Sequence, residues 1–243
     1  MYNKASNGVK KILLGLTTIA KGEWRNKVKE IDKLGIKEIA LFLTCLNFEE
    51  RQELYKLLEN TGLKNVPHVH LRNDMEIPEL DYLASRFKTE VFNIHPENTP
   101  YPFLIDYGKY NRNIYIENNS EGSPTKNDLK KYGGLCIDLS HWQAAALSKS
   151  EQSEEFITIK DLAKKYKIGV NHISAVKLKP VTYQDRFLNK SYTDYSTHWL
   201  DDLSEVDYVK KYKDYLAEII SIELENPLKR QLEVKNYLEK IIY

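Results

Sequence analysis

Residues 113–142 read NIYIENNSEGSPTKNDLKKYGGLCIDLSHW, two short apolar runs separated by a helical pattern. The runs around Ile114–Ile116 and Leu135–Ile137 are typical of buried strands, since both are short and apolar and contain isoleucine. The first run ends in Glu117 and the second in Asp138. A strand that only filled a core would have no use for a carboxylate at its exit. This unit therefore indicates a strand–helix–strand fold with a functional edge.

The same alternation extends along the whole chain. Strands are predicted in segments 10–18, 36–44, 65–72, 89–96, 113–119, 134–142, 168–176 and 219–227. Helices are predicted in segments 23–35, 48–62, 78–87, 102–110, 126–133, a longer region ending at 167, 205–218 and 228–242. Eight strand–helix units in about 250 residues predict an α/β fold, a single (β/α)8 TIM barrel covering residues 1–243. A doubly wound open sheet is the alternative, but it usually has fewer strands.

The composition excludes several classes of protein. Of 243 residues, 42% are apolar and 29% charged, which suits one domain with a sizeable core. The net charge of +1 gives no global basic field for nucleic acid or anionic lipid. No stretch approaches the roughly 18 apolar residues of a membrane span, and the short run after Lys11 is read as a strand rather than a signal peptide. Two cysteines indicate a reducing compartment, and we expect a cytoplasmic protein.

Polar side chains recur on one face of the predicted strands. Side chains alternate with period two, so the residues opposite the apolar face point into the barrel. Six strands place a histidine or carboxylate inward near their C-terminal ends: His68 and His70, His95, Glu117, Asp138, His172, and Glu223 and Glu225. His141 follows Asp138 by three positions, and His198 lies in the loop after the seventh strand. Active sites of this fold are built at that end of the barrel.

Such a ring predicts a divalent metal. Several buried carboxylates in one mouth repel each other and raise each other's pKa unless a cation lies between them. Neutral imidazoles combined with carboxylates suit Zn²⁺ first, with Mn²⁺ or Fe²⁺ as alternatives.

The chain resembles the xylose-isomerase-like barrel superfamily, and within it most closely the endonuclease IV family of AP endonucleases. The resemblance is specific at segments 114–123 (IYIENNSEGS), 134–145 (GLCIDLSHWQAA), 93–96 (NIHP) and 222–227 (IELENP). It implies metal-dependent hydrolysis of a phosphodiester, at an abasic site or a similar substrate, by a metal-bound hydroxide. The partner would be a small phosphate-bearing or sugar substrate, or damaged DNA.

The resemblance also implies a ligand set for two to three ions. Glu117 and Glu223 would be bridging and catalytic carboxylates. His70 and His95 would join Glu117 at one ion, Asp138 and His172 would bind the second, and His141 and His198 would bind the third. His68 and Glu225 share the parity of His70 and Glu223, so each choice stays open, although His68 reads better as a core histidine.

The chain departs from the family pattern beyond the seventh strand. Ser196 stands where the family has an aspartate two residues before the loop histidine, and Asp194 lies four residues before His198. The glycine-rich segment expected after that histidine is replaced by WLDDLSEVD at 199–207. These departures bear on the third metal and on the DNA substrate.

A second branch of the superfamily offers the main alternative function. Sugar or sugar-phosphate isomerases and epimerases bind one metal, and here the set would be Glu117, Asp138, His172 and Glu223. Glu117 and Glu223 would then act as acid and base. His70, His95 and His198 would be superfluous. A binding module without turnover is the third alternative.

Substrate contacts are predicted in two places. Segment 176–199 reads as a long loop that interleaves basic and aromatic residues, so we expect a substrate lid in which Lys177 and Lys179 contact phosphate. Trp142 would stack on a sugar or base, or cover the rim of the barrel. Cys136 reads as a small core residue.

Overall fold

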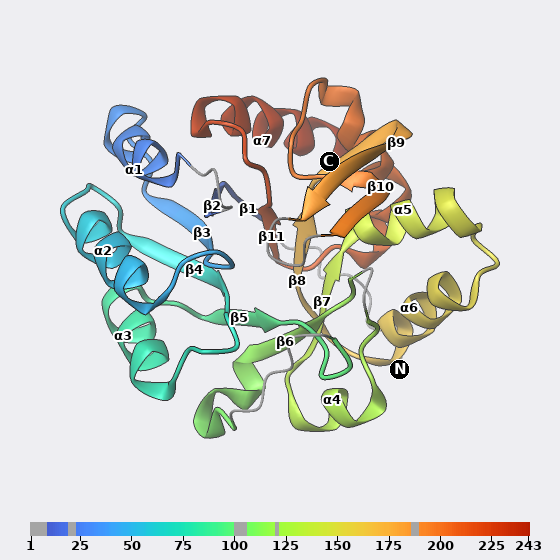
Figure 1. Ribbon diagram of the computed structural model, residues 1–243, viewed down its shortest axis with the longest axis horizontal. Coiled ribbons are helices and arrows are strands. Elements are labelled where there is room, and N and C mark those ends of the chain that lie inside the picture. The colour runs from blue at the N-terminus through green and yellow to red at the C-terminus, as the bar shows by residue number, and fades with distance from the viewer. Residues whose placement is uncertain (1–8, 19–22, 100–105, 120–121, 186–189) are drawn as a thin grey trace.

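The first predicted strand closes the barrel. In the computed structural model, which describes residues 9–18, 23–99, 106–119, 122–185 and 190–243, this strand consists of β1 (Lys11–Leu13) and β2 (Gly15–Thr17). β1 pairs with β11 at one edge of a parallel sheet ordered β1-β11-β8-β7-β6-β5-β4-β3-β2, and β2 pairs with β3 at the other edge. Because only Leu14 separates the two segments, both edges belong to one stretch of chain. The sheet is therefore an eight-stranded (β/α)8 barrel, as predicted (Figure 1).

The other elements follow the predicted order. The remaining barrel strands are β3 (Glu38–Phe42), β4 (Asn65–His70), β5 (Val91–Ile94), β6 (Ile114–Glu117), β7 (Gly134–Asp138), β8 (Ile168–Ile173) and β11 (Ile219–Ile222). The helices around them are α1 (Trp24–Lys33), α2 (Phe48–Glu59), α3 (Ile77–Phe87), α4 (Lys126–Lys131), α5 (Leu139–Lys149), α6 (Glu154–Lys165) and α7 (Leu228–Ile242). The long helical region before residue 167 is thus two helices, α5 and α6.

Three sequence predictions need correction. The helix expected at 102–110 lies partly outside the described residues, and the described part forms a 3-10 helix, η1 (Gly108–Asn113). The helix expected at 205–218 is a 3-10 run, η2 (Leu203–Tyr215), with a kink at Tyr212. The loop expected at 176–199 is largely an antiparallel hairpin of β9 (Ala175–Asp185) and β10 (Lys190–Thr197). Its alternating polar and apolar residues pair with each other across the hairpin, so the segment needs no place in the main sheet.

Period-two alternation separates two cores. Ile114, Ile116 and Ile137 belong to the large cluster between the strands and the helices. A smaller cluster fills the inside of the barrel: Leu13, Ala40, Phe42, Val91, Tyr115, Cys136, Val170 and Ile219. Inward-facing residues at the C-terminal ends of the strands lie above this smaller cluster. This arrangement confirms the predicted parity.

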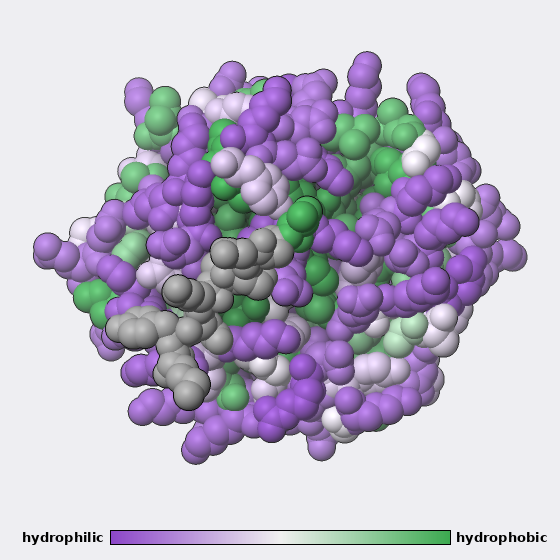
Figure 2. Space-filling model, turned by 180° about the vertical axis from the view of Figure 1, so that it is seen from behind, coloured by the Kyte–Doolittle hydropathy of each residue, from purple (hydrophilic) through white to green (hydrophobic). Residues whose placement is uncertain are grey.

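The two ends of the barrel differ. At the N-terminal end, a hollow of about 710 Å³ is lined by residues from the starts of several strands, such as Val91, Ile168 and Ile219. From behind the view of Figure 1, the surface is mostly hydrophilic, with hydrophobic side chains showing between the charged ones (Figure 2). The predicted site lies at the other end. No helix in the described part of the chain is long and apolar enough to span a bilayer.

Gln231 of α7 holds the closing seam together. Its side-chain oxygen accepts from the N–H of Gly15 at 2.7 Å, and its side-chain nitrogen donates to the carbonyls of Gly15 and Leu224 at 3.0 and 2.9 Å. Gly15 is required here because a Cβ would lie 2.0 Å from the carbonyl oxygen of Ile222. A fully buried amide thus satisfies the backbone where the strand changes partner.

We expect Gln231→Ala to lower the free energy of unfolding by about 2–4 kcal/mol, because buried backbone groups of the seam lose their partner. Urea denaturation followed by circular dichroism measures this change. The matched control is Gln52→Ala on the exposed face of α2, which should alter stability by less than about 0.5 kcal/mol. An equal, small effect of both substitutions would contradict the role of Gln231.

Candidate metal centre

The predicted donor residues converge at the C-terminal mouth of the barrel. His70 and Glu117 end β4 and β6, Asp138 ends β7, and His172 lies near the end of β8. The residues that follow β5 and β11 complete the set: His95 and Glu223. Parallel strands all point the same way, so six side chains from distant parts of the chain meet at one end.

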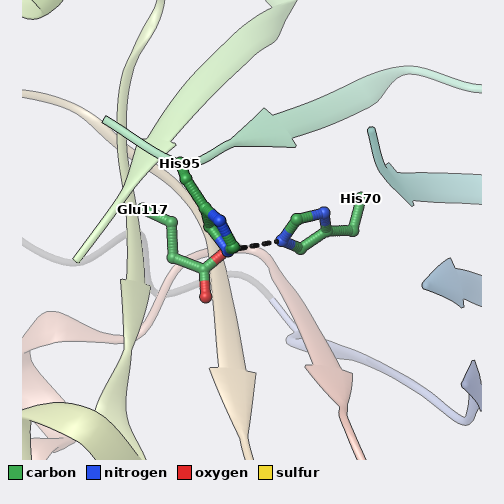
Figure 3. A group of neighbouring side chains, drawn as sticks. All are labelled: His70, His95 and Glu117. Atoms are coloured by element: carbon green, nitrogen blue, oxygen red, sulfur yellow. Dashed lines mark hydrogen bonds and ion pairs between the residues drawn. The ribbon is translucent and has the colours of Figure 1, made fainter. Parts of the chain in front are cut away.

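His70, His95 and Glu117 form the first donor group (Figure 3). The Nε2 atom of His70 lies 3.2 Å from Nε2 of His95 and 3.1 Å from Oε2 of Glu117. Because Nδ1 of His70 lies 3.0 Å from the carbonyl oxygen of Leu71, which only accepts, Nδ1 is a hydrogen-bond donor and Nε2 is the nitrogen available to a metal. The donor atoms of a tetrahedral zinc site lie about 3.3 Å apart for Zn–N bonds of about 2.0 Å. Nε2 of His95 lies 4.0 Å from the same oxygen of Glu117, so two of the three spacings match such an ion and the third is wider.

His95 is the most open member of this group. About a third of its side chain is exposed (32%), yet loss of hydration and the neighbouring His70 lower its pKa to about 4. It is therefore neutral at physiological pH, the form in which an imidazole binds a metal.

Glu117, Asp138, His172 and Glu223 form the second donor group, with one ligand atom of each within 4.8 Å of the others. The Nδ1 atom of His172 lies 3.2 Å from Oε1 of Glu117 and 3.2 Å from Oε2 of Glu223. Its Nε2 atom faces the sulfur of Cys136 at 3.4 Å. Glu117 thus directs one oxygen to each donor group.

Asp138 presents an unsatisfied oxygen to the second group. Its Oδ1 atom caps α5 by accepting from the backbone N–H groups of Ser140 and His141 at 2.7 and 3.0 Å. Its Oδ2 atom is buried and has no hydrogen-bond partner in the described part of the chain. The nearest recorded ionisable partner is Nε2 of His141, 3.7 Å away. A buried carboxylate oxygen in this state suits a metal ion.

The charge of the site also calls for a cation. Within the described residues, each ion pair recorded for Glu117, Asp138 and Glu223 is with a histidine. Burial would raise the pKa of Glu223, but His198 and His172 outweigh it and lower the pKa to about 2. Burial likewise opposes the shift at Glu117, where His172 and His70 bring the pKa well below its usual range. The carboxylates are therefore ionised, and the donor set fits divalent metal.

A hydrogen-bonded chain supports Glu117 from below. Asn93 donates to Oε2 of Glu117 at 2.5 Å, and its own side-chain oxygen lies 2.8 Å from Nε2 of His68. The Nδ1 atom of His68 lies 2.8 Å from Oγ of Ser221. His68 is therefore a fully buried histidine with both nitrogens bonded, as its interpretation as a core residue requires. Sequence reasoning missed Asn93 and Ser221, although both have inward parity.

Two histidines lie at the rim outside these compact groups. His198 has Nε2 at 3.8 Å from Oε1 of Glu223, and a third of its side chain is exposed (33%). His141 lies beside Asp138, as described above. Glu223 is buried in the site, whereas Glu225 is exposed. Glu223, not Glu225, joins the donor group.

Of the three residues expected to contact substrate, Trp142 and Lys177 are engaged with other side chains. Trp142 is only 2% exposed, packs on Tyr212 and donates from Nε1 to the carbonyl of Phe156, so it offers no face to a ligand. Lys177 forms ion pairs with Asp201 and Glu205 at 2.7 and 2.8 Å. Lys179 is exposed on β9.

Fold and site together define a (β/α)8 barrel with a buried histidine–carboxylate centre. A xylose isomerase-like TIM barrel protein from Mycobacterium smegmatis, solved in complex with magnesium, is 15% identical, with a TM-score of 0.50 and 96% of each chain covered. An uncharacterised protein from Parabacteroides distasonis is 17% identical, with a TM-score of 0.48, covering 95% of this chain and 98% of the other. No family model matches the sequence, and no curated protein does. At these identities the likeness concerns the fold.

We expect Asn93→Leu to lower the free energy of unfolding by about 2–4 kcal/mol, because His68 loses a buried partner. Affinity for Zn²⁺ should fall by about 10–100-fold, because Glu117 is no longer held in place. Thermal unfolding and calorimetric titration with Zn²⁺ measure the two effects. Asn127→Leu, on the exposed face of α4, is the control. Unchanged Zn²⁺ affinity in Asn93→Leu would show that the chain below Glu117 serves stability alone.

Proposed function

We propose that the chain is a metal-dependent hydrolase of phosphodiesters or related phosphate esters, similar to endonuclease IV, with two to three divalent ions at the mouth of the barrel. The position of Glu117 carries this proposal. One of its oxygens lies 3.1 Å from Nε2 of His70, and the other lies 3.2 Å from Nδ1 of His172. A carboxylate shared by two donor groups suits a pair of neighbouring ions, and paired ions suit phosphoester hydrolysis.

The donor types indicate which ions these groups would hold. The histidine-rich first group suits Zn²⁺, Mn²⁺ or Fe²⁺. The carboxylate-rich second group also suits Mn²⁺ or Mg²⁺, and the similar barrel from Mycobacterium smegmatis was solved with magnesium. His141 and His198 would serve a third ion at the rim. When bound, such ions acidify water and polarise phosphoryl oxygens.

The side chains at the mouth of the barrel have different proposed roles in substrate approach, proton transfer and metal bridging. The partly exposed His95, His141 and His198 mark the side from which a substrate approaches, since the remaining donors are buried. Glu223 is 8% exposed against 3% for Glu117, so we assign the transfer of a proton from attacking water to Glu223. Glu117 is held by His70, Asn93 and His172, which suits a fixed bridging role.

Phosphate recognition by Lys177 is not part of the proposal. Its ammonium group already has two carboxylate partners, and releasing it would leave Glu205, whose side chain is only 15% exposed, without its cation. The exposed Lys179 remains a candidate for a weak, salt-sensitive contact with a phosphate backbone. Damaged DNA and small phosphate esters are both compatible with such a mouth.

Sugar or sugar-phosphate isomerisation is the second candidate. The second donor group alone, Glu117, Asp138, His172 and Glu223, is a complete set for one divalent ion. Glu117 and Glu223 would then exchange a proton beside a carbonyl. The first donor group would have no role in that reaction, and for this reason we favour hydrolysis.

We expect freshly purified protein to contain two to three equivalents of divalent metal by plasma mass spectrometry. His95→Ala should remove about one equivalent, because the first group loses a donor. His198→Ala should affect only a rim ion. A single equivalent that neither substitution changes would overturn the hydrolase and leave the isomerase.

We expect the metal-loaded protein to cleave an oligonucleotide with one abasic site or a simple phosphodiester, and not to interconvert ketoses. Glu223→Gln should lower kcat by about 100-fold or more while keeping the fold, since the amide cannot take up a proton. Ketose turnover without phosphodiester cleavage would establish the second candidate. Absence of turnover on both panels would favour a binding module.

A further inference from the structure

We propose that Asp194 and Ser196 of β10 are positioning residues. Through a hydrogen-bonded chain they fix the orientation of the His141 ring and the nitrogen that carries its proton. The proposal rests on the proposed function, since His141 is taken as a ligand of the rim ion. It assigns roles to two hairpin residues that the donor groups do not include.

The hairpin brings these residues to α5 by an irregular register. Val181 pairs with Asp194 but Val176 pairs with Ser196, so residues 177–180 of β9 lie opposite a single residue of β10. Pro180 lies in this stretch and has no N–H to give to a ladder. β10 packs against α5, whose first turn carries His141 (Figure 1). The bulge thus directs Ser196 inward, where its exposure is 5%.

The direction of each hydrogen bond in the chain Asp194–Ser196–His141 follows from the single proton of the serine hydroxyl. The Oγ atom of Ser196 lies 3.0 Å from Oδ2 of Asp194 and 3.3 Å from Nδ1 of His141. A carboxylate only accepts, so the single hydroxyl proton of Ser196 goes to Asp194. The hydroxyl oxygen must then accept from Nδ1–H of His141. In the neutral form of the ring the lone pair then lies on Nε2, which faces Oδ2 of Asp138 at 3.7 Å.

In the neutral form of the His141 ring, two acceptor atoms would therefore face each other at the rim. The Oδ2 atom of Asp138 is the buried oxygen without a hydrogen-bond partner in the described part of the chain, and Nε2 of His141 is the ring nitrogen that the chain from Asp194 leaves free for a metal. This is the arrangement in which a histidine gives its second N–H to an outer partner and presents the other nitrogen to a metal. His141 would thus present Nε2 to the rim ion beside Asp138.

The exchange at position 196 has a chemical consequence. A serine hydroxyl is a poor substitute for a carboxylate ligand, so an ion at the rim would have one anionic donor fewer than with an aspartate at position 196. The nearby carboxylate belongs to Asp194, which contacts His141 only through Ser196. Its Oδ1 atom accepts from the N–H of Tyr195 at 2.6 Å. Asp194 and Ser196 therefore orient and polarise His141 instead of binding the ion.

The test is a calorimetric titration of the metal-stripped full chain with Zn²⁺, using variants Ser196→Ala, Asp194→Asn and Ser196→Thr. We expect the first two to weaken the weakest Zn²⁺ equivalent by about 10–100-fold, leaving the tighter equivalents unchanged. Threonine keeps the hydroxyl and should restore affinity to within about threefold. Ser191→Ala, an exposed serine on the same strand, is the matched control.

A second readout needs no metal. Nitrogen NMR of the imidazole rings in the metal-stripped protein reports which nitrogen of His141 carries the proton. We expect Nδ1–H in the wild type and a mixture of tautomers in Ser196→Ala. His141→Ala identifies the resonance and should abolish the weakest Zn²⁺ equivalent.

The two proposals fail in different ways. An unchanged tautomer and unchanged Zn²⁺ affinity in Ser196→Ala, with His141→Ala still weakening binding, would overturn the role of Ser196 and leave the metal centre intact. Absence of Zn²⁺ binding in the wild type would overturn the proposed function. The tautomer of His141 would still decide whether the chain from Asp194 sets the ring.

Discussion

Burial of three carboxylates in one barrel mouth is the constraint on which the rest of this structure depends. Glu117, Asp138 and Glu223 are between 0% and 8% exposed, and their recorded ion pairs within the described residues are with histidines alone. Without compensation, ionised groups at this depth would cost several kcal/mol each. Histidine rings, the start of α5 and the amide of Asn93 supply part of that compensation, and a divalent ion would supply the rest.

The architecture holds these groups from two sides. From below, the chain Ser221–His68–Asn93 reaches Glu117 across the inside of the barrel. From the rim, the bulged hairpin reaches His141. Both supports depend on a closed barrel. If the strands separated, contacts between residues more than 150 positions apart in the sequence, such as His68 and Ser221, would be lost. The seam at Gly15, held by Gln231, is thus part of the support of the site.

Periodicity explains what could be predicted. The alternation of eight strands with helices identified the barrel, and alternation with period two identified the inward face that carries His70, Glu117 and Asp138. Segment 176–199 is expected to be a loop because of its length and its mixed basic and aromatic residues, but it forms a hairpin outside the main sheet. Trp142 is expected at the substrate or at the rim of the barrel, whereas the helix that Asp138 caps turns this ring into the core against Tyr212. A local sequence pattern shows which side of a strand or helix a residue occupies, but it does not show which residues pack against that side.

The sequence by itself determined the eight strands, the inward parity and the types of donor atom, because these follow from local spacing and side-chain chemistry. Only the tertiary structure decided between His68 and His70, or between Glu223 and Glu225. Residues two apart on a strand share a face, so parity cannot tell which lies in the mouth and which below or beyond it. Strand register sets that depth. Contacts made in the folded chain, with the adjacent Leu71 for His70 and the distant Ser196 for His141, decided which ring nitrogen faces the site.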